Sequence, residues 1–232
     1  MILAAGRGER MRPLTDRCPK PLLPAGGRAL IAHLLDALAR AGLSRVVVNT
    51  AHLGERLEQA LGDGRAHGLR IDWSREGEAL ETAGGIALAL ERGLLPHDEP
   101  FLLVNGDIWT DLDFSSFVGR ARRALDDPRI DAHLLLVDNP PHHVAGDFDL
   151  RATRVVSRPQ SGDERLTYAG VGVYRPRLFA DLVPGTRAPL APRLFAARDR
   201  DALCAERHRG RWFDIGTPQR LAELDRALRE GF

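Results

Sequence analysis

The stretch that most constrains the fold is the N-terminal one, residues 1–22. Three apolar residues at its start run directly into Ala4-Ala5-Gly6-x-Gly8, where small residues predominate, which favours a short strand that opens into a loop. Small side chains let backbone N–H groups approach a charged ligand, and Arg10, Arg12 and Lys20 add positive charge to the same loop. The stretch is therefore typical of a loop that holds a polyphosphate.

A dinucleotide-binding turn is the main alternative for this loop. Its G-x-G-x-x-G pattern needs a third glycine at a position that is Met11 here, and no acidic residue suited to a ribose follows the next predicted strand. A lone Gly6-x-Gly8 would not separate the two alternatives. The addition of Arg10, Pro13 and Lys20 favours phosphate binding.

Length and charge limit the classes of protein that the chain can belong to. At 232 residues the chain is long enough for one α/β domain with a sizeable core, so we predict a single domain over residues 1–232. The 33 Lys and Arg residues nearly balance the 32 Asp and Glu residues. Without an overall electrostatic field, we expect neither a nucleic-acid partner nor an anionic membrane partner.

The cysteines and the apolar runs bear on the cellular setting. Cys18 and Cys204 lie far apart without CxxC spacing, which argues against a zinc site or a disulfide framework and favours a reducing compartment. No apolar run approaches the roughly 20 residues of a membrane-spanning helix. We therefore predict a cytoplasmic protein.

Helical and strand-like patterns alternate along the first 137 residues. Amphipathic spacing predicts helices over 29–41, 53–61, 82–92 and 115–125, and short apolar or β-branched runs predict strands over 45–49, 69–73, 101–104 and 132–137. This alternation predicts a Rossmann-like α/β fold, with a mostly parallel sheet and helices on both faces. Ligands of such sheets gather at the carboxyl ends of the strands.

The remainder of the chain is less regular. We expect a hairpin over 146–157, a glycine-interrupted strand over 168–174 and a last helix over 217–230, with Thr217 as its N-cap and Pro218 as its first residue. Thr82 is expected to cap the helix that follows it. The sequence predicts no oligomeric state.

Two aspartates are candidates for metal ligands. Asp107 follows the predicted strand 101–104, and Asp214 follows an aromatic pair. Joining two phosphates concentrates negative charge, which Mg²⁺ with oxygen ligands neutralises. The alternative for each aspartate is a structural one, because aspartate is common in turns and helix caps.

The order Leu-Ala-Ala-Gly-x-Gly-x-Arg-Met-x-Pro-Leu-Thr, followed by Pro-Lys-Pro, resembles the signature of the sugar-1-phosphate nucleotidyltransferases. The segments around Asp107 and Asp214 are similar to the two metal-binding motifs of that family, and the resemblance covers nearly the whole chain. It implies that these two aspartates hold a catalytic Mg²⁺. It also implies that Arg10 stabilises the departing pyrophosphate and that Lys20 bridges the two reacting phosphates. The C-terminal β-helix of many longer relatives is not expected.

The segment 76–85 looks like the base-recognition segment of this family, with Ala83 where relatives commonly have glycine. A capped helix with a flexible entry is the structural alternative, and it is compatible with binding. The resemblance then implies the following nucleotide-binding residues: Ala4, Ala5, Gly6, Gly8, Glu9, Arg10, Lys20, Glu76, Glu81, Thr82, Gly84 and Asn105.

The segment 137–148 carries the resemblance on the acceptor side, where it is similar to the N-acetylmuramate α-1-phosphate uridylyltransferases of bacterial cell-wall recycling. Two adjacent histidines, His142 and His143, point apart in most backbones and lack a third ligand, so loop packing or sugar contact is favoured over zinc. Ser157-Arg158 stands where many relatives have Glu-Lys. The implied sugar-binding residues are Asn105, Gly146, Asp147, Arg158 and Gly170.

The resemblance implies nucleotidyl transfer from a nucleoside triphosphate, with UTP favoured, to a sugar 1-phosphate. N-acetylmuramate 1-phosphate is the first choice of acceptor. Mannose or glucose 1-phosphate, with GTP, dTTP or UTP, is the alternative within the class. A regulatory module that binds nucleotide-sugars without turning them over is the alternative outside it, and the joint presence of Arg10, Lys20, Asp107 and Asp214 argues against that module.

Overall fold

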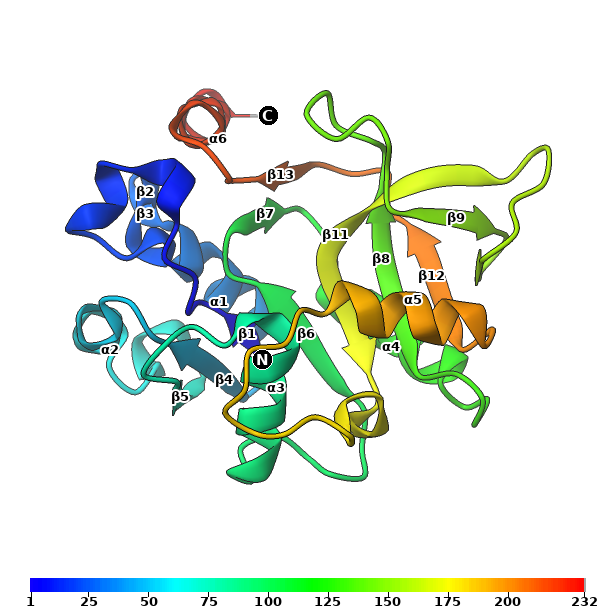
Figure 1. Cartoon of the computed structure of the whole chain (residues 1–232). Coiled ribbons are helices and arrows are strands. Elements are labelled where there is room, and N and C mark those ends of the chain that lie inside the picture. Colours follow the sequence, from blue (N-terminus) through cyan, green and yellow to red (C-terminus); the bar gives the residue numbers. More distant parts are fainter. Residues whose placement is uncertain (232) are drawn as a thin grey trace.

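The computed structural model describes residues 1–231, and within them the central element is a sheet of nine strands (Figure 1). In spatial order the strands are β5 (Arg70–Arg75), β4 (Arg45–Thr50), β1 (Ile2–Leu3), β6 (Phe101–Asn105), β11 (Glu164–Tyr174), β8 (Ala132–Val137), β12 (Leu203–Arg207), β10 (Arg154–Val156) and β9 (Phe148–Arg151).

Most of these strands run in one direction. β5, β4, β1 and β6 pair in parallel, and β8 and β12 pair in parallel with each other. β11 lies between β6 and β8 and is antiparallel to both, so β6 and β8 point the same way. The predicted mostly parallel sheet is confirmed, with one long opposing strand at its centre.

Helices cover both faces of the sheet, as predicted. α1 (Leu30–Arg40), α2 (Gly54–Leu61) and α4 (Phe114–Ala124) pack on one face, and α3 (Glu81–Glu91) and α5 (Ala191–Asp199) pack on the other (Figure 1). Each face has its own buried apolar cluster. Leu35 and Phe117 belong to the first cluster, and Ile86 and Leu194 belong to the second.

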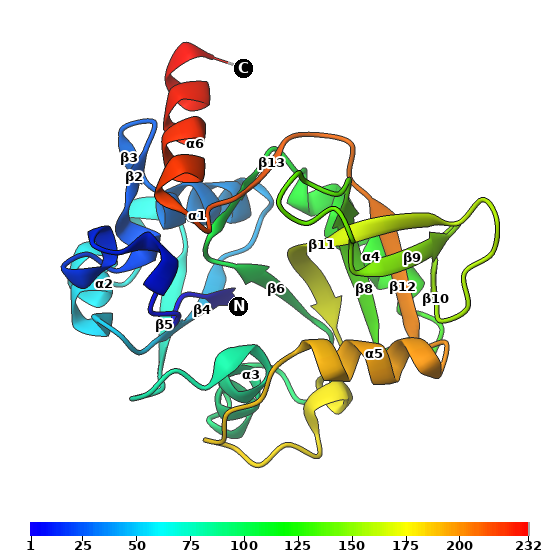
Figure 2. The same ribbon diagram turned by 45° about the horizontal axis from the view of Figure 1, so that its top comes forward.

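A third apolar cluster joins the two ends of the chain. It contains Met11 from the N-terminal loop and Leu224 from the last helix, α6 (Pro218–Glu230). α6 stands beside the hairpin of β2 (Pro24–Ala25) and β3 (Arg28–Ala29), as Figure 2 shows, and the Asp225 carboxylate accepts a 2.8 Å hydrogen bond from the backbone N–H of Gly26. The C-terminal helix thus stabilises the loop that the sequence singled out.

The predicted elements match the structure except at a few places. The last helix has Thr217 as its N-cap, as predicted, but Leu80 and not Thr82 occupies the N-cap of α3. The backbone carbonyl of Ala188 accepts the free N–H groups of Ala83 and Gly84, so a distant segment replaces the predicted side-chain cap. The single domain stays a prediction.

Several short elements were not predicted. They are β7 (Ile108–Thr110), β13 (Trp212–Asp214), β12, α5, the hairpin of β2 and β3, and 3-10 turns at Glu9–Met11, Leu14–Asp16, Lys20–Leu22, Arg65–His67 and Pro176–Phe179. In the described part of the chain β7 and β13 pair only with each other, in a separate two-stranded ribbon. None of the helices within residues 1–231 combines the length and the apolar character that a bilayer-spanning segment requires.

Candidate active site

Three adjoining hollows form a cleft at the carboxyl ends of β1, β4 and β6, within the part of the chain that the structure describes. The loop hollow, of about 280 Å³, is lined by Ala4–Gly6, Lys20 and the start of α3. The acid hollow, of about 380 Å³, is lined by Arg10, Asp107, Asp214 and the 142–143 loop. The apolar hollow, of about 450 Å³, is lined by Tyr168 and α5 residues. Asn105, the last residue of β6, borders all three.

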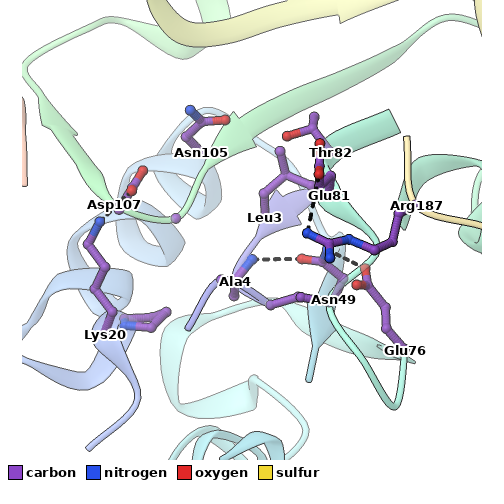
Figure 3. Close-up of a pocket in the computed structure, with 15 residues that line it drawn as sticks. Leu3, Ala4, Lys20, Asn49, Glu76, Glu81, Thr82, Asn105, Asp107 and Arg187 are labelled. Atoms are coloured by element: carbon purple, nitrogen blue, oxygen red, sulfur yellow. Dashed lines mark hydrogen bonds and ion pairs between the residues drawn. The ribbon is translucent and has the colours of Figure 1, made fainter. Parts of the chain in front are cut away.

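The predicted phosphate-binding loop contributes its small residues and one buried cation. Ala4, Ala5 and Gly6 line the loop hollow, and Lys20 extends past them to Asp107, with 2.5 Å between Nζ and Oδ2 (Figure 3). The Lys20 side chain is only 10% exposed, so its charge acts in a poorly solvated place. Lys20 is also the only lysine of the chain, since every other basic position among the 33 Lys and Arg residues is an arginine.

Other predicted loop residues lie around the cleft rather than in it. Gly8 has a positive φ of 65°, and its carbonyl accepts a 2.8 Å hydrogen bond from the Thr15 hydroxyl, so it contributes to the conformation of the loop and does not line the cleft. Glu9 is exposed and lines none of the three hollows. Arg10, one residue further, lines the acid hollow.

The ribbon of β7 and β13 brings the two predicted acids together. Asp214 lies opposite Ile108, and the N–H of Ile215 donates a 2.9 Å hydrogen bond to the backbone carbonyl of Asp107. Both carboxylates line the acid hollow. Each has a basic neighbour, Lys20 for Asp107 and, for Asp214, the guanidinium of Arg220 at 2.7 Å.

The donor set of the acid hollow fits Mg²⁺. Within residues 1–231 no cluster of three His, Cys, Asp or Glu side chains has the arrangement of a metal cage. Mg²⁺ is usually held by one or two carboxylates, with waters and substrate phosphates as its other ligands. Asp107 and Asp214, both bordering one hollow beside a phosphate-binding loop, offer that kind of partial shell.

Two side chains beyond the acids, those of Asn49 and Glu76, line the loop hollow near Ala4. Asn49, the next-to-last residue of β4, accepts a 2.6 Å hydrogen bond from the N–H of Ala4 and donates one of 2.6 Å to the carboxylate of Glu76. The other Glu76 oxygen accepts the N–H of Leu80 at 2.9 Å. Burial raises the pKa of Glu76 above its ordinary value, although these hydrogen bonds act in the opposite direction.

The start of α3 borders the loop hollow through only some of its predicted residues. Glu81 and Thr82 line it, and Arg187 reaches over it to an ion pair of 3.3 Å with Glu81 (Figure 3). Gly84 lines none of the three hollows, because the backbone at Thr186 packs against it. A Cβ at this position would overlap the carbonyl oxygen of Thr186. Ala83 is fully buried in the core, so the exchange of glycine for alanine at this position does not reach the cleft.

The acceptor end of the cleft includes some of the predicted sugar-binding residues. Gly170 has a positive φ of 75°, and a Cβ there would lie 2.7 Å from the Asn105 amide, so the glycine makes room for Asn105. Asp147 lines the apolar hollow, but its carboxylate oxygens accept hydrogen bonds from the His143 ring at 2.9 Å and from the N–H of Tyr168 at 2.8 Å.

Two predicted sugar-binding residues lie outside the hollows. Gly146 lines none of them, and its carbonyl accepts a hydrogen bond from Arg165. Arg158 is exposed beyond β10, where its carbonyl meets Arg151. The guanidinium of Arg158, which stands where many relatives have a lysine, therefore does not line the cleft.

The two adjacent histidines have different partners. His142 lies 3.3 Å from the Asp214 carboxylate and contacts Arg220, whereas His143 bonds Asp147. Both rings line the acid hollow but turn to different partners. Asn49, Arg187 and Tyr168 were not predicted. For Asn49 the only sequence signal was its place at the end of a buried strand.

The comparison with known proteins decides the family. The profile of the family described as Nucleotidyl transferase matches residues 1–231. The chain belongs to this nucleotidyl transferase family. The predicted resemblance to sugar nucleotidyltransferases is thereby confirmed.

Relatives within the nucleotidyl transferase family share most of the chain. The N-acetylmuramate alpha-1-phosphate uridylyltransferase of Neisseria meningitidis is 48% identical over 96% of this chain and 95% of its own length. The protein of the same name from Caulobacter vibrioides is 36% identical over 99% of this chain and 96% of its own. The Xenopus laevis mannose-1-phosphate guanyltransferase beta-A is 29% identical over 94% of this chain but only 61% of its own length.

Solved structures that this chain resembles support the fold. HddC from Yersinia pseudotuberculosis complexed with GMP-PN superposes with a TM-score of 0.77 at 20% identity, over 97% of this chain and 96% of the other. A Bacillus anthracis protein, described as a glucose-1-phosphate thymidylyltransferase, gives 0.82 at 21% identity over 100% and 95%.

Proposed function

We propose that this nucleotidyl transferase is a Mg²⁺-dependent uridylyltransferase that converts UTP and N-acetylmuramate α-1-phosphate into the UDP-sugar and pyrophosphate. The substrates follow from the names of the two relatives that are 48% and 36% identical over nearly the whole chain. The observation that carries the chemistry is the acid hollow, where Arg10, Asp107 and Asp214 border one space beside Lys20. A role in cell-wall recycling and a cytoplasmic location stay predictions.

In the proposed reaction an oxygen of the acceptor phosphate forms a bond to the α-phosphorus of UTP, and the bond from that phosphorus to the bridging oxygen of the β-phosphate breaks. The nucleophile is already ionised, so positioning and charge stabilisation supply the catalysis. Lys20 approaches the α-phosphate and the incoming phosphate, and Arg10 meets the departing pyrophosphate. Asp107 and Asp214 would hold Mg²⁺, which neutralises phosphate charge when bound.

The test is a coupled pyrophosphate-release assay with Mg²⁺ over a grid of nucleotides and acceptors. UTP, GTP, dTTP and CTP are each paired with the 1-phosphates of N-acetylmuramate, mannose and glucose. We expect the highest kcat/KM for UTP with N-acetylmuramate 1-phosphate. Turnover confined to mannose 1-phosphate would overturn the acceptor, and no turnover with any pair would favour a binding module.

The Asp107→Asn variant tests the role of the acid hollow in this assay. It should remove turnover while the variant stays folded, because the amide keeps the shape but not the charge of the ligand. Asp111→Asn is the matched control, since Asp111 lies at the end of the same ribbon but bonds His208 at 3.0 Å outside the hollows. The control should retain turnover.

A further inference from the structure

We propose that Asn49 is a positioning residue for base selection: it holds the Glu76 carboxylate in the nucleoside end of the loop hollow, where that carboxylate favours bases that carry an imino N–H. The inference deepens the proposed function and rests on it for the identity of the nucleotide. Asn49 itself is only 2% exposed, but it borders the loop hollow together with Glu76 (Figure 3).

The position of Asn49 makes it a link between the two ligand-binding segments. It lies beside Leu3 in the pairing of β1 with β4, so it stands where the phosphate-binding loop begins. Its carbonyl oxygen takes the N–H of Ala4, and its amide nitrogen bonds Glu76 Oε1. One side chain therefore ties the first residue of the loop to the segment that precedes α3.

The Glu76 carboxylate is fixed from three sides. Oε1 accepts from Asn49, Oε2 accepts from the N–H of Leu80, and a Cβ at Gly85 would overlap Oε1. A carboxylate offers about four lone-pair sites, so two accepted hydrogen bonds leave acceptor capacity for a ligand. Because the group is partly buried, a ligand that leaves it unpaired or opposes its charge is penalised more than in water.

The chemistry of the bases then gives a selection rule. Uracil, thymine and guanine each carry a ring N–H that can donate to a carboxylate, whereas the corresponding ring nitrogen of cytosine or adenine has a lone pair that would face it. A carboxylate whose free lone pair is held at that ring nitrogen therefore admits the first group and disfavours the second, because it cannot turn to the exocyclic amino group of cytosine or adenine. A mobile carboxylate would discriminate less, since it could turn away from the base.

Only an amide suits this link. Asparagine supplies an acceptor for Ala4 and a donor for Glu76 from one short side chain. Leucine at position 49 has a similar size but supplies neither group. The backbone N–H of Ala4 and the carboxylate of Glu76 would then each lose a hydrogen-bond partner. Ser74 is a natural control, because it lies opposite Asn49 on β5, is fully buried, and its hydroxyl has no hydrogen-bond partner among residues 1–231.

The experiment is equilibrium binding of UTP and of CTP, without acceptor, to the wild type, Asn49→Leu, Glu76→Gln and Ser74→Ala. We expect the wild type to bind UTP more tightly than CTP. Asn49→Leu and Glu76→Gln should each reduce the UTP:CTP affinity ratio at least about tenfold. Ser74→Ala should leave this ratio within about twofold of the wild type. Glu76→Gln alters no backbone contact of Ala4, so it keeps the test open where Asn49→Leu fails to fold.

The double variant shows whether the two residues act as one unit. If Asn49 acts through Glu76, the double variant that combines Asn49→Leu with Glu76→Gln should reduce the UTP:CTP affinity ratio by about the larger of the two single-variant factors. Independent residues would instead reduce it by the product of the two factors. An unchanged ratio in a folded Asn49→Leu protein, or multiplying losses, would overturn the inference. Failure of the proposed function would instead show as no turnover of N-acetylmuramate 1-phosphate by the wild type, whatever the binding ratio.

Discussion

The two halves of the sheet are built differently and contribute different parts of the cleft. In the nucleotide half, β5, β4, β1 and β6 are parallel, and the connections between them carry the phosphate-binding loop and the start of α3. In the acceptor half, β8 and β12 are flanked by β11 and β10, which run antiparallel to them, and the cleft is bordered by residues on β11 and on the 139–147 loop.

The two halves differ in the contacts that hold the residues lining the cleft. Nucleotide-half residues lie at or just after strand ends, and a residue within a neighbouring strand fixes them, as when the Asn49 side chain on β4 accepts the N–H of Ala4. The acceptor half depends on the carboxylate of a loop residue, since Asp147 accepts hydrogen bonds from the nearby His143 ring and from the backbone N–H of Tyr168 on β11. We therefore expect changes in the nucleotide half to affect turnover, and changes in the acceptor half to affect acceptor binding or stability.

The largest effect is expected from Lys20→Met in the nucleotide half. The change removes the buried cation beside Asp107, and kcat should fall about 10³-fold because charge stabilisation inside a poorly solvated site is lost. Steady-state kinetics with UTP and N-acetylmuramate 1-phosphate provide the measurement. Lys20→Arg should also be impaired, since a planar guanidinium does not replace a compact ammonium. A loss below about tenfold in both variants would place the catalytic charge elsewhere.

The next largest effect concerns the stability of the acceptor half. Burial alone would raise the pKa of Glu206, but hydrogen bonds from His133 and from Arg120 outweigh it and lower the pKa from 4.5 to about 2. A carboxyl whose folded pKa is depressed stabilises the fold above its unfolded pKa, and this stabilisation is lost as the pH falls from about 4.5 toward 2. After solvent screening we expect it to be about 2 kcal/mol at neutral pH.

Urea unfolding of the wild type and Glu206→Gln over a pH series measures this contribution. The difference in unfolding free energy should be greatest near neutral pH and shrink as the pH falls through the stated range. Turnover at neutral pH should change little, because Glu206 borders none of the three hollows. A difference that does not vary with pH would mean that the carboxylate charge is not the cause.

A smaller effect is expected from Asp147→Asn in the 139–147 loop. The amide loses the negative charge and can accept at one oxygen only, so the hydrogen bonds to His143 and to the N–H of Tyr168 are weakened. KM for the sugar phosphate should rise about tenfold, with KM for UTP nearly unchanged. Asp149→Asn is the control, because Asp149 pairs with Arg165 outside the hollows. An equal rise in both KM values would contradict the division between the halves.

The smallest effect is expected from Arg158→Ala. The side chain is exposed and lies outside the cleft, so both KM values should stay within about twofold of the wild type. The same kinetics measure it. A rise of about tenfold in KM for the sugar phosphate would mean that the segment after β10 closes over the acceptor during the reaction.

The sequence predicted the nucleotide half well because its information is local. A helical period followed by a short apolar run locates an element without knowledge of its neighbours, and the predicted strands 45–49 and 101–104 correspond to β4 and β6. In the acceptor half, β12 is recognisable only beside β8, where Leu203 lies opposite Ala132. Short strands of this kind depend on pairing rather than on period.

The same distinction separates the site residues. The motif around Lys20 and the two aspartates was visible as a sequence pattern, and the structure brings them to adjoining spaces. Gly84 was assigned to the nucleotide, but the segment around Ala188 covers it. Asn49 was overlooked because its role depends on the pairing of β1 with β4 and on a carboxylate 27 residues away.

The lone lysine makes the protein unusually simple to label. An amine-directed acylating reagent has one side chain to modify, and that side chain borders the loop hollow while bound to Asp107. The rate of acylation would report how often this ion pair opens. Protection by UTP, followed by mass spectrometry, would turn a single chemical modification into a gauge of site occupancy, with no engineered probe.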